Sequence, residues 1–351
     1  MRAITVEPGI ANSVQLEERP EPTSDPSSLL IQAVALGVCG TDREIISGAY
    51  GFAPPGATRL VLGHESLGRV LKAPGDSGFA VGDLVAGIVR RPDPVPCVAC
   101  AAGEWDMCHN GRYTESGIKS LDGYAAERFR LDPAYTVKIA PALGRLGVLL
   151  EPASVLAKAW DQIERIGRRS RSWRPKSVLV TGAGPVGLIA ALMAVQRGFA
   201  LHVMDHADSG AKPDLVHALG GTYHPLVLPT DLSVDIIVEC TGAPQLVLDV
   251  ISHLDGEGIA CLTGLSAAGT MQPFDGGDFN RRLVLQNEVV FGSVNANRRH
   301  YEAAMTSLAS ADPAWLGGLI TRQVPLPRWR EAFEKRRGDI KVVLLFEDLP
   351  A

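Results

Sequence analysis

A group of glycines at residues 182–187 constrains the fold of this chain more than any other feature. It reads Gly182-Ala-Gly184-Pro-Val-Gly187 and follows the apolar run Ser177–Val180. Gly182 permits a tight turn, Gly184 lets an anionic group approach the backbone, and Gly187 lets a helix pack closely on a strand. The N–H groups at the start of the helix favour phosphate groups. We therefore interpret the segment as strand, phosphate-binding turn and helix, and not as an ordinary tight turn.

An acid at the end of the next apolar run supports this interpretation. Asp205 follows Leu201–Met204 and lies 23 residues after Gly182. That is about the spacing at which a carboxylate grips the ribose hydroxyls of a dinucleotide. A carboxylate at this place should repel a 2′-phosphate, so the sequence favours NAD. The nearby His206 and Lys212 keep NADP possible, since either could contact that phosphate.

The two halves of the chain differ in their pattern of apolar runs. Residues 177–293 alternate short apolar runs with helical stretches, which predicts a parallel sheet with crossover helices. Before about residue 142, short strand-like runs are separated by Gly, Pro and Asp, as in a partly open barrel. A predicted helix over 143–166 joins the two parts. The basic stretch 165–176 is interpreted as a solvated linker, with an anion-binding patch as the alternative.

Composition excludes several classes of protein. The net charge of −5, from 34 Lys+Arg and 39 Asp+Glu, argues against a dedicated nucleic-acid binder. The uncharged stretch 177–196 is interrupted by glycines and a proline, whereas a spanning helix needs about 20 continuous apolar residues. The first residues hold no apolar core of signal-peptide length. We expect a cytoplasmic protein of two domains, without nucleic-acid or membrane partners.

Four residues outside the glycine turn are candidate metal ligands. Cys39 is followed 25 residues later by His64 and Glu65, and Glu151 lies far downstream. Thiolate, imidazole and carboxylate suit zinc, and a catalytic zinc keeps one position open for substrate. In a chain that also binds a dinucleotide, hydride transfer from an alcohol gains from a Lewis acid that stabilises an alkoxide.

A second cluster holds Cys97, Cys100 and Cys108. In a cytosolic chain such clustering indicates a metal more than a disulfide. Three thiols are one ligand short of a tetrahedral structural zinc site. Asp93 or His109 could supply the fourth ligand, and the alternative is a metal-free loop with reduced thiols.

Together these residues resemble the zinc-dependent medium-chain alcohol dehydrogenase superfamily over essentially the whole chain. The segments 37–42 and 63–65 and the glycine turn are its general signatures. Further features resemble the archaeal-type glucose 1-dehydrogenases within it, namely Arg90–Pro92, Tyr113–Ile118, Asp122–Tyr124, Glu151–Pro152 and Gly292–Asn295.

The resemblance implies a fold in two parts. A GroES-like, partly open β-barrel catalytic domain would take residues 1–157 and 297–351. A Rossmann domain with a parallel sheet would take residues 158–296, so that the fold class is α/β. A homodimer or homotetramer is implied by analogy with the superfamily.

The resemblance also implies roles for single residues. Cys39 and His64 would be zinc ligands, and Glu65 and Glu151 would be ligands that are direct or exchange with substrate and water. Thr41 matches the hydroxyl residue that relays the proton of the substrate alcohol. Glu65 therefore counts as both a metal-ligand and a catalytic candidate.

Further positions match residues around the substrate and the cofactor. Glu115 matches a carboxylate that hydrogen-bonds sugar hydroxyls, with Glu151 beside it, and Asn295 matches an asparagine next to nicotinamide and substrate. Cys97, Cys100 and Cys108 match three of four structural-zinc thiols; Asp93 stands near the place of the absent first one. The candidate cofactor-binding residues are Gly182, Gly184, Pro185, Val186, Gly187, Asp205, His206, Thr241 and Asn295.

The activity implied is zinc-dependent oxidation of an aldose at C1, with hydride transfer to NAD(P) and a lactone as product. Relatives usually carry an Arg pair where this chain has Asp205 and His206, which shifts the expected cofactor to NAD. Val89 and Leu285 stand where some relatives have polar sugar-binding residues. The alternatives are a polyol or L-threonine dehydrogenase of the same superfamily and, more remotely, a zinc-free non-catalytic relative.

Overall fold

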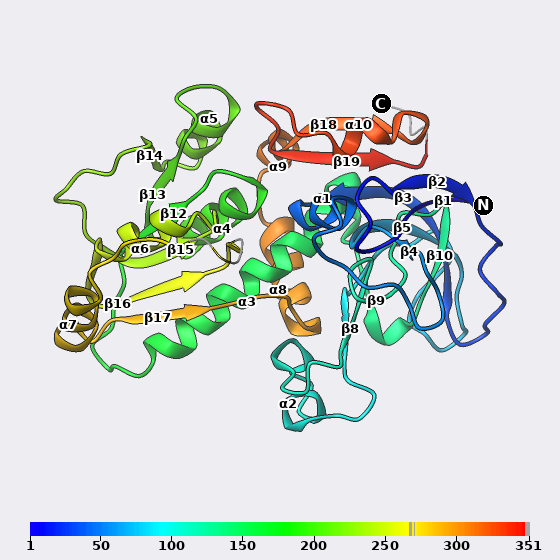
Figure 1. Ribbon diagram of the computed structural model, residues 1–351, viewed down its shortest axis with the longest axis horizontal. Coiled ribbons are helices and arrows are strands. Elements are labelled where there is room, and N and C mark those ends of the chain that lie inside the picture. Colours follow the sequence, from blue (N-terminus) through cyan, green and yellow to red (C-terminus); the bar gives the residue numbers. More distant parts are fainter. Residues whose placement is uncertain (267–268, 270, 348–351) are drawn as a thin grey trace. The chain divides into compact units, whose positions relative to one another are not determined.

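The computed structural model describes residues 1–266, 269 and 271–347, and the chain divides into two compact units. The first unit comprises Met1–Ser154 and Asn295–Ala351, and the second comprises Val155–Val294. The domain boundaries expected from the sequence lie two or three residues further along the chain. The second unit is thus inserted into the sequence of the first (Figure 1).

Within the described residues, the first unit is built on a seven-stranded sheet of order β11-β6-β5-β3-β19-β18, with β10 paired to β3. Its longest strand is β3 (Leu29–Val38), which pairs antiparallel with β5, β10 and β19. Two further sheets have the orders β2-β1-β4 and β7-β8-β9. The other strands are β1 (Arg2–Val6), β2 (Gln15–Glu18), β4 (Leu60–Val61), β5 (Glu65–Lys72), β6 (Leu84–Gly87), β7 (Arg90–Arg91), β8 (Thr114–Ser116), β9 (Ser120–Leu121), β10 (Arg128–Leu131), β11 (Thr136–Lys138), β18 (Ile320–Pro325) and β19 (Lys341–Leu345).

Apolar residues of these strands pack around a common core. Most residues of β3, β5 and β19 are buried, whereas β10 alternates. In β10, Phe129 and Leu131 are buried while Arg128 and Arg130 are partly exposed, because successive side chains of a strand point to opposite faces. The strands therefore pack around a common apolar core, which confirms the strands expected in the first part of the chain.

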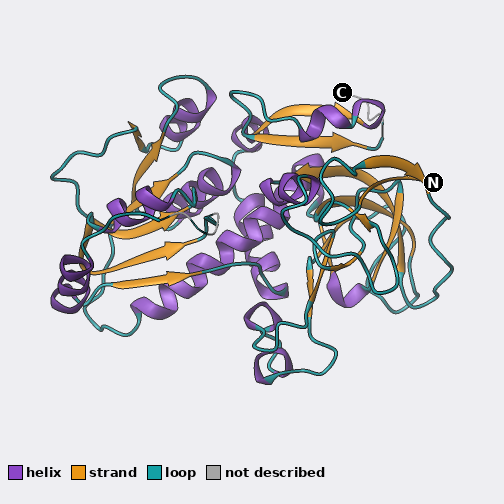
Figure 2. Ribbon diagram, in the orientation of Figure 1, coloured by secondary structure: helices purple, strands orange, loops and turns teal. Residues whose placement is uncertain are grey.

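Short helices connect and flank these strands (Figure 2). The α-helices of the first unit are α1 (Gly40–Ile46), α2 (Val98–Ala101), α8 (Arg298–Ala309), α9 (Pro313–Leu319) and α10 (Arg330–Phe333), with 3₁₀ turns η1 (Trp105–Met107), η2 (Pro133–Tyr135), η3 (Pro141–Leu149) and η4 (Leu326–Arg328). The sequence did not lead us to expect α9, although Asp312 caps it by accepting from Ala314 N at 2.8 Å. Pro313 then occupies its first position, a common helix start.

The helix expected over 143–166 begins differently in the structure. Residues Pro141–Leu149 form 3₁₀ turns, η3, and only Leu150–Gly167 form the α-helix, α3. Gly144 lies at φ 47°, outside helical geometry, and interrupts the run. Apolar spacing alone could not show this break, because it records which side chains are buried and not the backbone angles.

The second unit holds a six-stranded sheet of order β14-β13-β12-β15-β16-β17 within the described residues. Every pairing in it is parallel, which confirms the parallel sheet expected from the alternating pattern. This strand order is that of dinucleotide-binding domains. The chain adds strands to one side of β12 up to β14 and then continues on the other side from β15, so the order reverses between β12 and β15. Its elements are β12 (Ser177–Thr181), α4 (Pro185–Gln196), β13 (Ala200–Asp205), α5 (Ala211–Ala218), β14 (Thr222–Pro225), β15 (Val234–Glu239), α6 (Pro244–Ile251), β16 (Leu254–Leu262), α7 (Gly276–Gln286) and β17 (Val289–Gly292).

The uncharged stretch 177–196 is strand β12, the glycine turn and helix α4. Leu188–Ala194 are all buried in the second unit, so the apolar character of α4 reflects packing on the sheet. Among the described residues, no helix combines the length and the apolar character needed to cross a bilayer.

Two glycines of the turn meet different steric demands. Gly182 has φ 88°, a left-handed conformation that glycine adopts without strain. A Cβ atom at Gly187 would collide with the carbonyl oxygen of Gly182, whereas a Cβ at Gly184 would meet nothing within 4 Å. Gly187 is therefore required by the fold, and Gly184 is not.

This difference gives a first prediction. Gly187→Ala should lower the free energy of unfolding by about 1–3 kcal/mol, the usual cost of forcing extra atoms into packed structure. Gly184→Ala is the matched control and should leave stability near that of the wild type. Urea unfolding of the wild type and the two variants measures these changes in the free energy of unfolding. Equal stability of Gly187→Ala and Gly184→Ala would contradict the packing of α4 on β12.

A histidine pair lies at the β13–β14 edge of the second unit. Nδ1 of His202 and Nε2 of His224 are 3.0 Å apart, and the two rings are stacked with centroids 5.3 Å apart. Burial lowers the pKa of both imidazoles, and the charge of His202 lowers that of His224 further. The folded unit therefore favours two neutral rings.

The second prediction follows from this preference. The stabilising effect is complete above the unfolded-state pKa of about 6.5 and is lost as the pH falls below it, because only the unfolded chain then binds protons readily. The melting temperature should drop between about pH 7.5 and about pH 5. The drop should be smaller when both histidines are replaced by Gln, and an identical drop in that variant would show that other groups cause it.

Candidate active site

Three donor side chains from separate parts of the sequence meet in the first unit. Cys39 precedes α1 at the end of β3, His64 lies between β4 and β5, and Glu65 begins β5. The thiol, one imidazole nitrogen and one carboxylate oxygen lie within 4.8 Å of one another. His64 and Glu65 are buried, and Cys39 is partly exposed. The structure thus brings together three of the four residues expected to hold a catalytic metal.

Asp42 orients two of these donors. One carboxylate oxygen accepts from the backbone N–H of Cys39 at 2.8 Å, and the other lies 3.4 Å from Nδ1 of His64. Burial opposes protonation of the ring, yet the Asp42 carboxylate raises the pKa of His64 well above its usual value. An acid that faces one ring nitrogen leaves the other, Nε2, as the donor for a metal.

Glu65 is paired with a buried lysine from the far end of the chain. Nζ of Lys341 forms an ion pair with Oε2 of Glu65, and both side chains are almost fully buried. Nζ of Lys341 also donates to the carbonyl of Val38 at 3.3 Å. A Cβ atom at Gly37, the residue opposite Glu65 in the β3–β5 ladder, would collide with Oε2 of Glu65. Gly37 therefore makes room for the ion pair.

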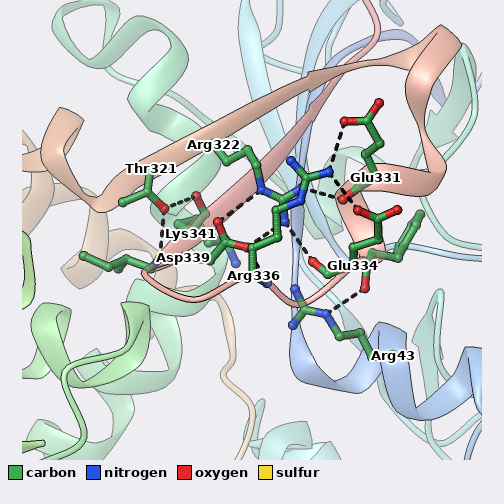
Figure 3. A network of polar contacts seen from close by, with 10 residues as sticks. Arg43, Thr321, Arg322, Glu331, Glu334, Arg336, Asp339 and Lys341 are labelled. Atoms are coloured by element: carbon green, nitrogen blue, oxygen red, sulfur yellow. Dashed lines mark hydrogen bonds and ion pairs between the residues drawn. The ribbon is translucent and has the colours of Figure 1, made fainter. Parts of the chain in front are cut away.

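A polar network fixes the chain just before Lys341 (Figure 3). Arg322 of β18 donates to both carboxylate oxygens of Asp339, at 3.1 and 2.6 Å. Nε of Arg43, on α1, donates to the carbonyl of Phe333 at 3.1 Å. These contacts join α1, which starts beside Cys39, to the end of α10, and they join β18 to Asp339, two residues before Lys341.

Glu151 and Thr41 lie in the same surroundings. Burial raises the pKa of Glu151 to about 7; the charge of Glu65 raises it as well, while His64 opposes this effect. The carboxyl group thus lies among the charges of the three-donor cluster, although it is not one of the three grouped donors. Oγ1 of Thr41 is 4.0 Å from Sγ of Cys39, so a hydroxyl stands next to the thiol.

The donor set fits zinc. A thiol, an imidazole and carboxylates are the ligands that catalytic zinc sites use. Burial should lower the pKa of the Lys341 ammonium, yet Glu65 and Cys39 raise it, as Asp42 does for His64. Both cationic side chains therefore lie beside acidic groups of the kind that divalent cations bind.

Glu115 is held at one oxygen and open at the other. Its Oε1 accepts from Nε of Arg90 at 3.0 Å and from Nδ2 of Asn295 at 2.7 Å, with Nη2 of Arg90 at 2.9 Å. The guanidinium of Arg90 stacks on the ring of Tyr113, 3.8 Å from its centroid. Within the described part of the chain, Oε2 has no hydrogen-bond partner. A fixed carboxylate with one open oxygen can accept a hydrogen bond from a substrate hydroxyl.

The second cysteine cluster also assembles. The sulfur atoms of Cys97, Cys100 and Cys108 lie within 4.8 Å of one another. Backbone N–H groups of residues 100 and 109 lower the pKa of Cys97 to about 6, which favours the thiolate that metals bind. The Asp93 carboxylate is not part of this group of donors; it accepts from Val95 N at 2.8 Å and from Nε of Arg112 at 3.2 Å. The side chain of His109 is exposed.

In the second unit, Asp205 lies at the end of β13 beside the glycine turn. Its carboxylate accepts from the backbone N–H groups of Ala183 and Ala207 at 2.7 and 3.0 Å. Nζ of Lys212 lies 3.0 Å from both carboxylate oxygens, and Nδ1 of His206 is 3.2 Å from one. Burial opposes ionisation, but these donors hold the pKa of Asp205 below its usual value. The charge of Asp205 is therefore compensated by Lys212.

A buried acid that the sequence did not single out organises the neighbouring strand end. Glu239, fully buried at the end of β15, accepts from the N–H and hydroxyl of Thr241 and from Gly242 N at 3.1 Å. The Thr181 hydroxyl of β12 donates to the same oxygen at 3.3 Å. The ends of β12 and β15 are thereby fixed at the reversal point of the sheet, where dinucleotides bind in such folds.

The remaining residues of the site that the sequence analysis did not assign are Asp42, Arg90 and Lys341. Asp42 and Arg90 lie inside the motifs 37–42 and 90–92, so the sequence showed a carboxylate and a guanidinium there. It did not show that they pair with His64 and Glu115. Lys341 gave no signal, because a lysine in an apolar run is ordinarily read as the solvent-facing residue of a strand.

Two sequence-family models match the chain. The family described as "Glucose dehydrogenase C-terminus" matches residues 144–346, and the "Alcohol dehydrogenase GroES-like domain" matches residues 25–141. The GroES-like catalytic domain expected from the motifs is therefore confirmed.

Known proteins of high similarity cover almost all of the chain. Glucose 1-dehydrogenase of Thermoproteus tenax is 40% identical over 98% of this chain and 99% of its own length. Glucose 1-dehydrogenase 1 of Caldivirga maquilingensis is 38% identical over 98% of both. The structure of Haloferax mediterranei glucose dehydrogenase in complex with NADP, Zn and gluconolactone is 31% identical, has a TM-score of 0.90 and matches 99% of this chain and 100% of that one. Similarity of this extent shows that the chain belongs to the zinc-dependent medium-chain alcohol dehydrogenase superfamily and, within it, to the glucose dehydrogenase family.

Proposed function

We propose that this protein is a zinc-dependent dehydrogenase that oxidises an aldose at C1 to the lactone with NAD(P). The observation that carries the proposal is the cluster of Cys39, His64 and Glu65, whose donor atoms lie within 4.8 Å of one another. The bound NADP, zinc and gluconolactone of the Haloferax mediterranei relative support the same reaction. The assignment of individual residues below is part of the proposal.

Cys39 and His64 would hold the zinc, with Glu65 and Glu151 as ligands that are direct or exchange with substrate and water. When bound, zinc supplies a Lewis acid that lowers the pKa of the substrate hydroxyl, and the dinucleotide accepts the hydride. Thr41, 4.0 Å from the Cys39 sulfur, carries the hydroxyl proton towards solvent.

Glu115 orients the sugar. Oε1 is occupied by Arg90 and Asn295, so Oε2 accepts from a sugar hydroxyl in a charge-assisted hydrogen bond. Glu151 and Asn295 complete the substrate site, and Asn295 also lies next to the nicotinamide. These contacts hold the sugar in the site and so contribute to the affinity for aldoses.

The second unit would bind the dinucleotide at the glycine turn. Gly182, Gly184, Pro185, Val186 and Gly187 form the turn that holds the pyrophosphate, with Thr241 at the neighbouring strand end. Asp205 would grip the ribose hydroxyls and so favour NAD, with His206 at the same end. Because Lys212 compensates the Asp205 carboxylate, repulsion of a 2′-phosphate is weakened, and NADP is accepted as well.

We also propose a second, structural zinc on the thiols Cys97, Cys100 and Cys108. Asp93, whose carboxylate accepts from Val95 N and Arg112, is the candidate fourth ligand.

We further propose a cytoplasmic homodimer or homotetramer that pairs through β17, the last strand of the parallel sheet. Light scattering of the purified protein measures its mass.

The metal proposal predicts separate losses of zinc and activity. Cys39→Ser or His64→Ala should abolish turnover and remove one zinc per chain, while binding of NADH, followed by fluorescence, stays close to wild type. Cys108→Ser is the matched control: it should remove the other zinc and leave the first in place. Near-normal turnover of either first variant would contradict the assignment of Cys39 and His64.

The substrate proposal predicts a preference that a panel of aldoses, polyols and L-threonine reveals, each tested with NAD and with NADP. Aldoses should give the highest kcat/KM, and NAD should exceed NADP. Glu115→Ala should raise the KM for aldoses about tenfold or more, the effect of losing a hydrogen bond to a charged group. It should change KM much less for a simple alcohol, where one is accepted. Preference for L-threonine would overturn the proposed function.

A further inference from the structure

Asp106 contacts Arg90, which bonds Glu115, and Asn297, which follows Asn295, the other partner of Glu115. The backbone carbonyl of Asp106 accepts from Nη1 of Arg90 at 3.1 Å. Its Oδ1 accepts from Nδ2 of Asn297 at 2.7 Å, and Asn297 is two residues after Asn295. All these contacts lie within the first unit.

The contacts form a closed ring. Arg90 and Asn295 both donate to Oε1 of Glu115. Asp106 connects Arg90 to the 295–297 segment, since its carbonyl accepts from Arg90 and its carboxylate accepts from Asn297. Four members, Arg90, Glu115, Asp106 and Asn297, are 5% exposed or less. Hydrogen bonds in a buried network restrict the conformations of the side chains that form it.

The backbone at Asn295 adds a reason for such a clamp. Asn295 has φ 61°, in the left-handed region that few residues other than glycine adopt. Its neighbour Asn297 starts helix α8 as the N-cap and is tied to Asp106 by the 2.7 Å hydrogen bond. The bond to Asp106 therefore anchors the segment that carries the Asn295 amide towards Glu115.

We propose that Asp106 is a positioning residue for sugar recognition: through Arg90 and Asn297 it holds Glu115 so that Oε2 faces the substrate. Asp106 acts through these residues and touches neither substrate nor cofactor. Its loss should weaken aldose binding and leave the hydride step nearly unchanged, because the zinc ligands are outside the ring. The inference rests on the proposed function, in which Glu115 binds a sugar hydroxyl.

Reversal of the Asp106–Asn297 hydrogen bond tests the proposal. Asn297→Asp keeps a residue that caps helices as well as Asn does, but it places a carboxylate against Asp106. The KM for the best aldose should rise about tenfold, as expected for a lost hydrogen bond to a charged group, with kcat within about threefold of wild type. The double variant Asp106→Asn/Asn297→Asp restores an amide-to-carboxylate bond in the opposite direction and should return KM to within about threefold of wild type.

Two further comparisons separate positioning from general damage. In a Glu115→Ala background, Asn297→Asp should add no further increase in KM, because the side chain that it positions is absent. Glu104→Gln is the matched control: Glu104 joins the same segment to α8 through Nη1 of Arg299 at 2.9 Å and should leave KM unchanged. Zinc content, NADH binding and melting temperature are measured for every variant.

The proposal is overturned if Asn297→Asp, with wild-type zinc content and NADH binding, keeps the wild-type KM. It is equally overturned if the increase persists in the Glu115→Ala background or if the double variant does not recover. Should Asn297→Asp not fold, Asp106→Ala removes the acceptor without adding charge and takes its place in the comparisons with Glu115→Ala and Glu104→Gln. A wild-type protein that oxidises no aldose would instead refute the proposed function, which the wild-type panel detects before any variant is made.

Discussion

The ion pair between Glu65 and Lys341 is the contact on which the first unit depends most. Both groups are almost fully buried, and an isolated charge in that position would cost several kcal/mol. The pair therefore requires β5 and β19, nearly 280 residues apart in sequence, to flank β3 in one register. Gly37 must lie between them, because any side chain would occupy the place of the carboxylate. The sheet and the candidate metal site are thus specified by the same contact.

The other buried acids of the first unit follow the same rule. Asp42 faces His64, and Glu115 faces Arg90. Each acid lies on a different segment from its partner, so each pair fixes two segments as well as one functional group. Asp106 extends this arrangement into the segment that carries the cysteine cluster, since it lies two residues before Cys108. The proposed sugar site and the proposed structural zinc site therefore share a stretch of backbone.

In the second unit, the negative charges of buried acids are compensated by main-chain N–H groups as well as by a cationic side chain. Asp205 accepts from Ala183 and Ala207, and Glu239 accepts from Thr241 and Gly242. Both acids end a parallel strand at the edge where the glycine turn lies. These hydrogen bonds hold the loops of that edge in place, and a fixed loop lowers the entropic cost of binding a ligand there.

Local chemistry made much of this protein visible in its sequence. The glycine spacing, the acid at residue 205 and the alternation over 177–293 predicted a parallel dinucleotide-binding sheet, because turn geometry and strand burial act over a few residues. The same holds for Cys39, His64 and Glu65, whose side-chain types indicate a metal. The break at Gly144 and the helix α9 were not foreseen, because backbone angles and caps are weaker signals than apolar spacing.

The sequence by itself determined the fold class, the position of the glycine turn and the kinds of donor atom available. Only the tertiary structure decided which donors meet and which charges are compensated. It placed Lys341 on Glu65, Lys212 on Asp205, and Asp106 against Arg90 and Asn297. The physical reason is that burial makes a charge costly unless an opposite charge or a donor reaches it, and such partners come from segments that only folding brings together.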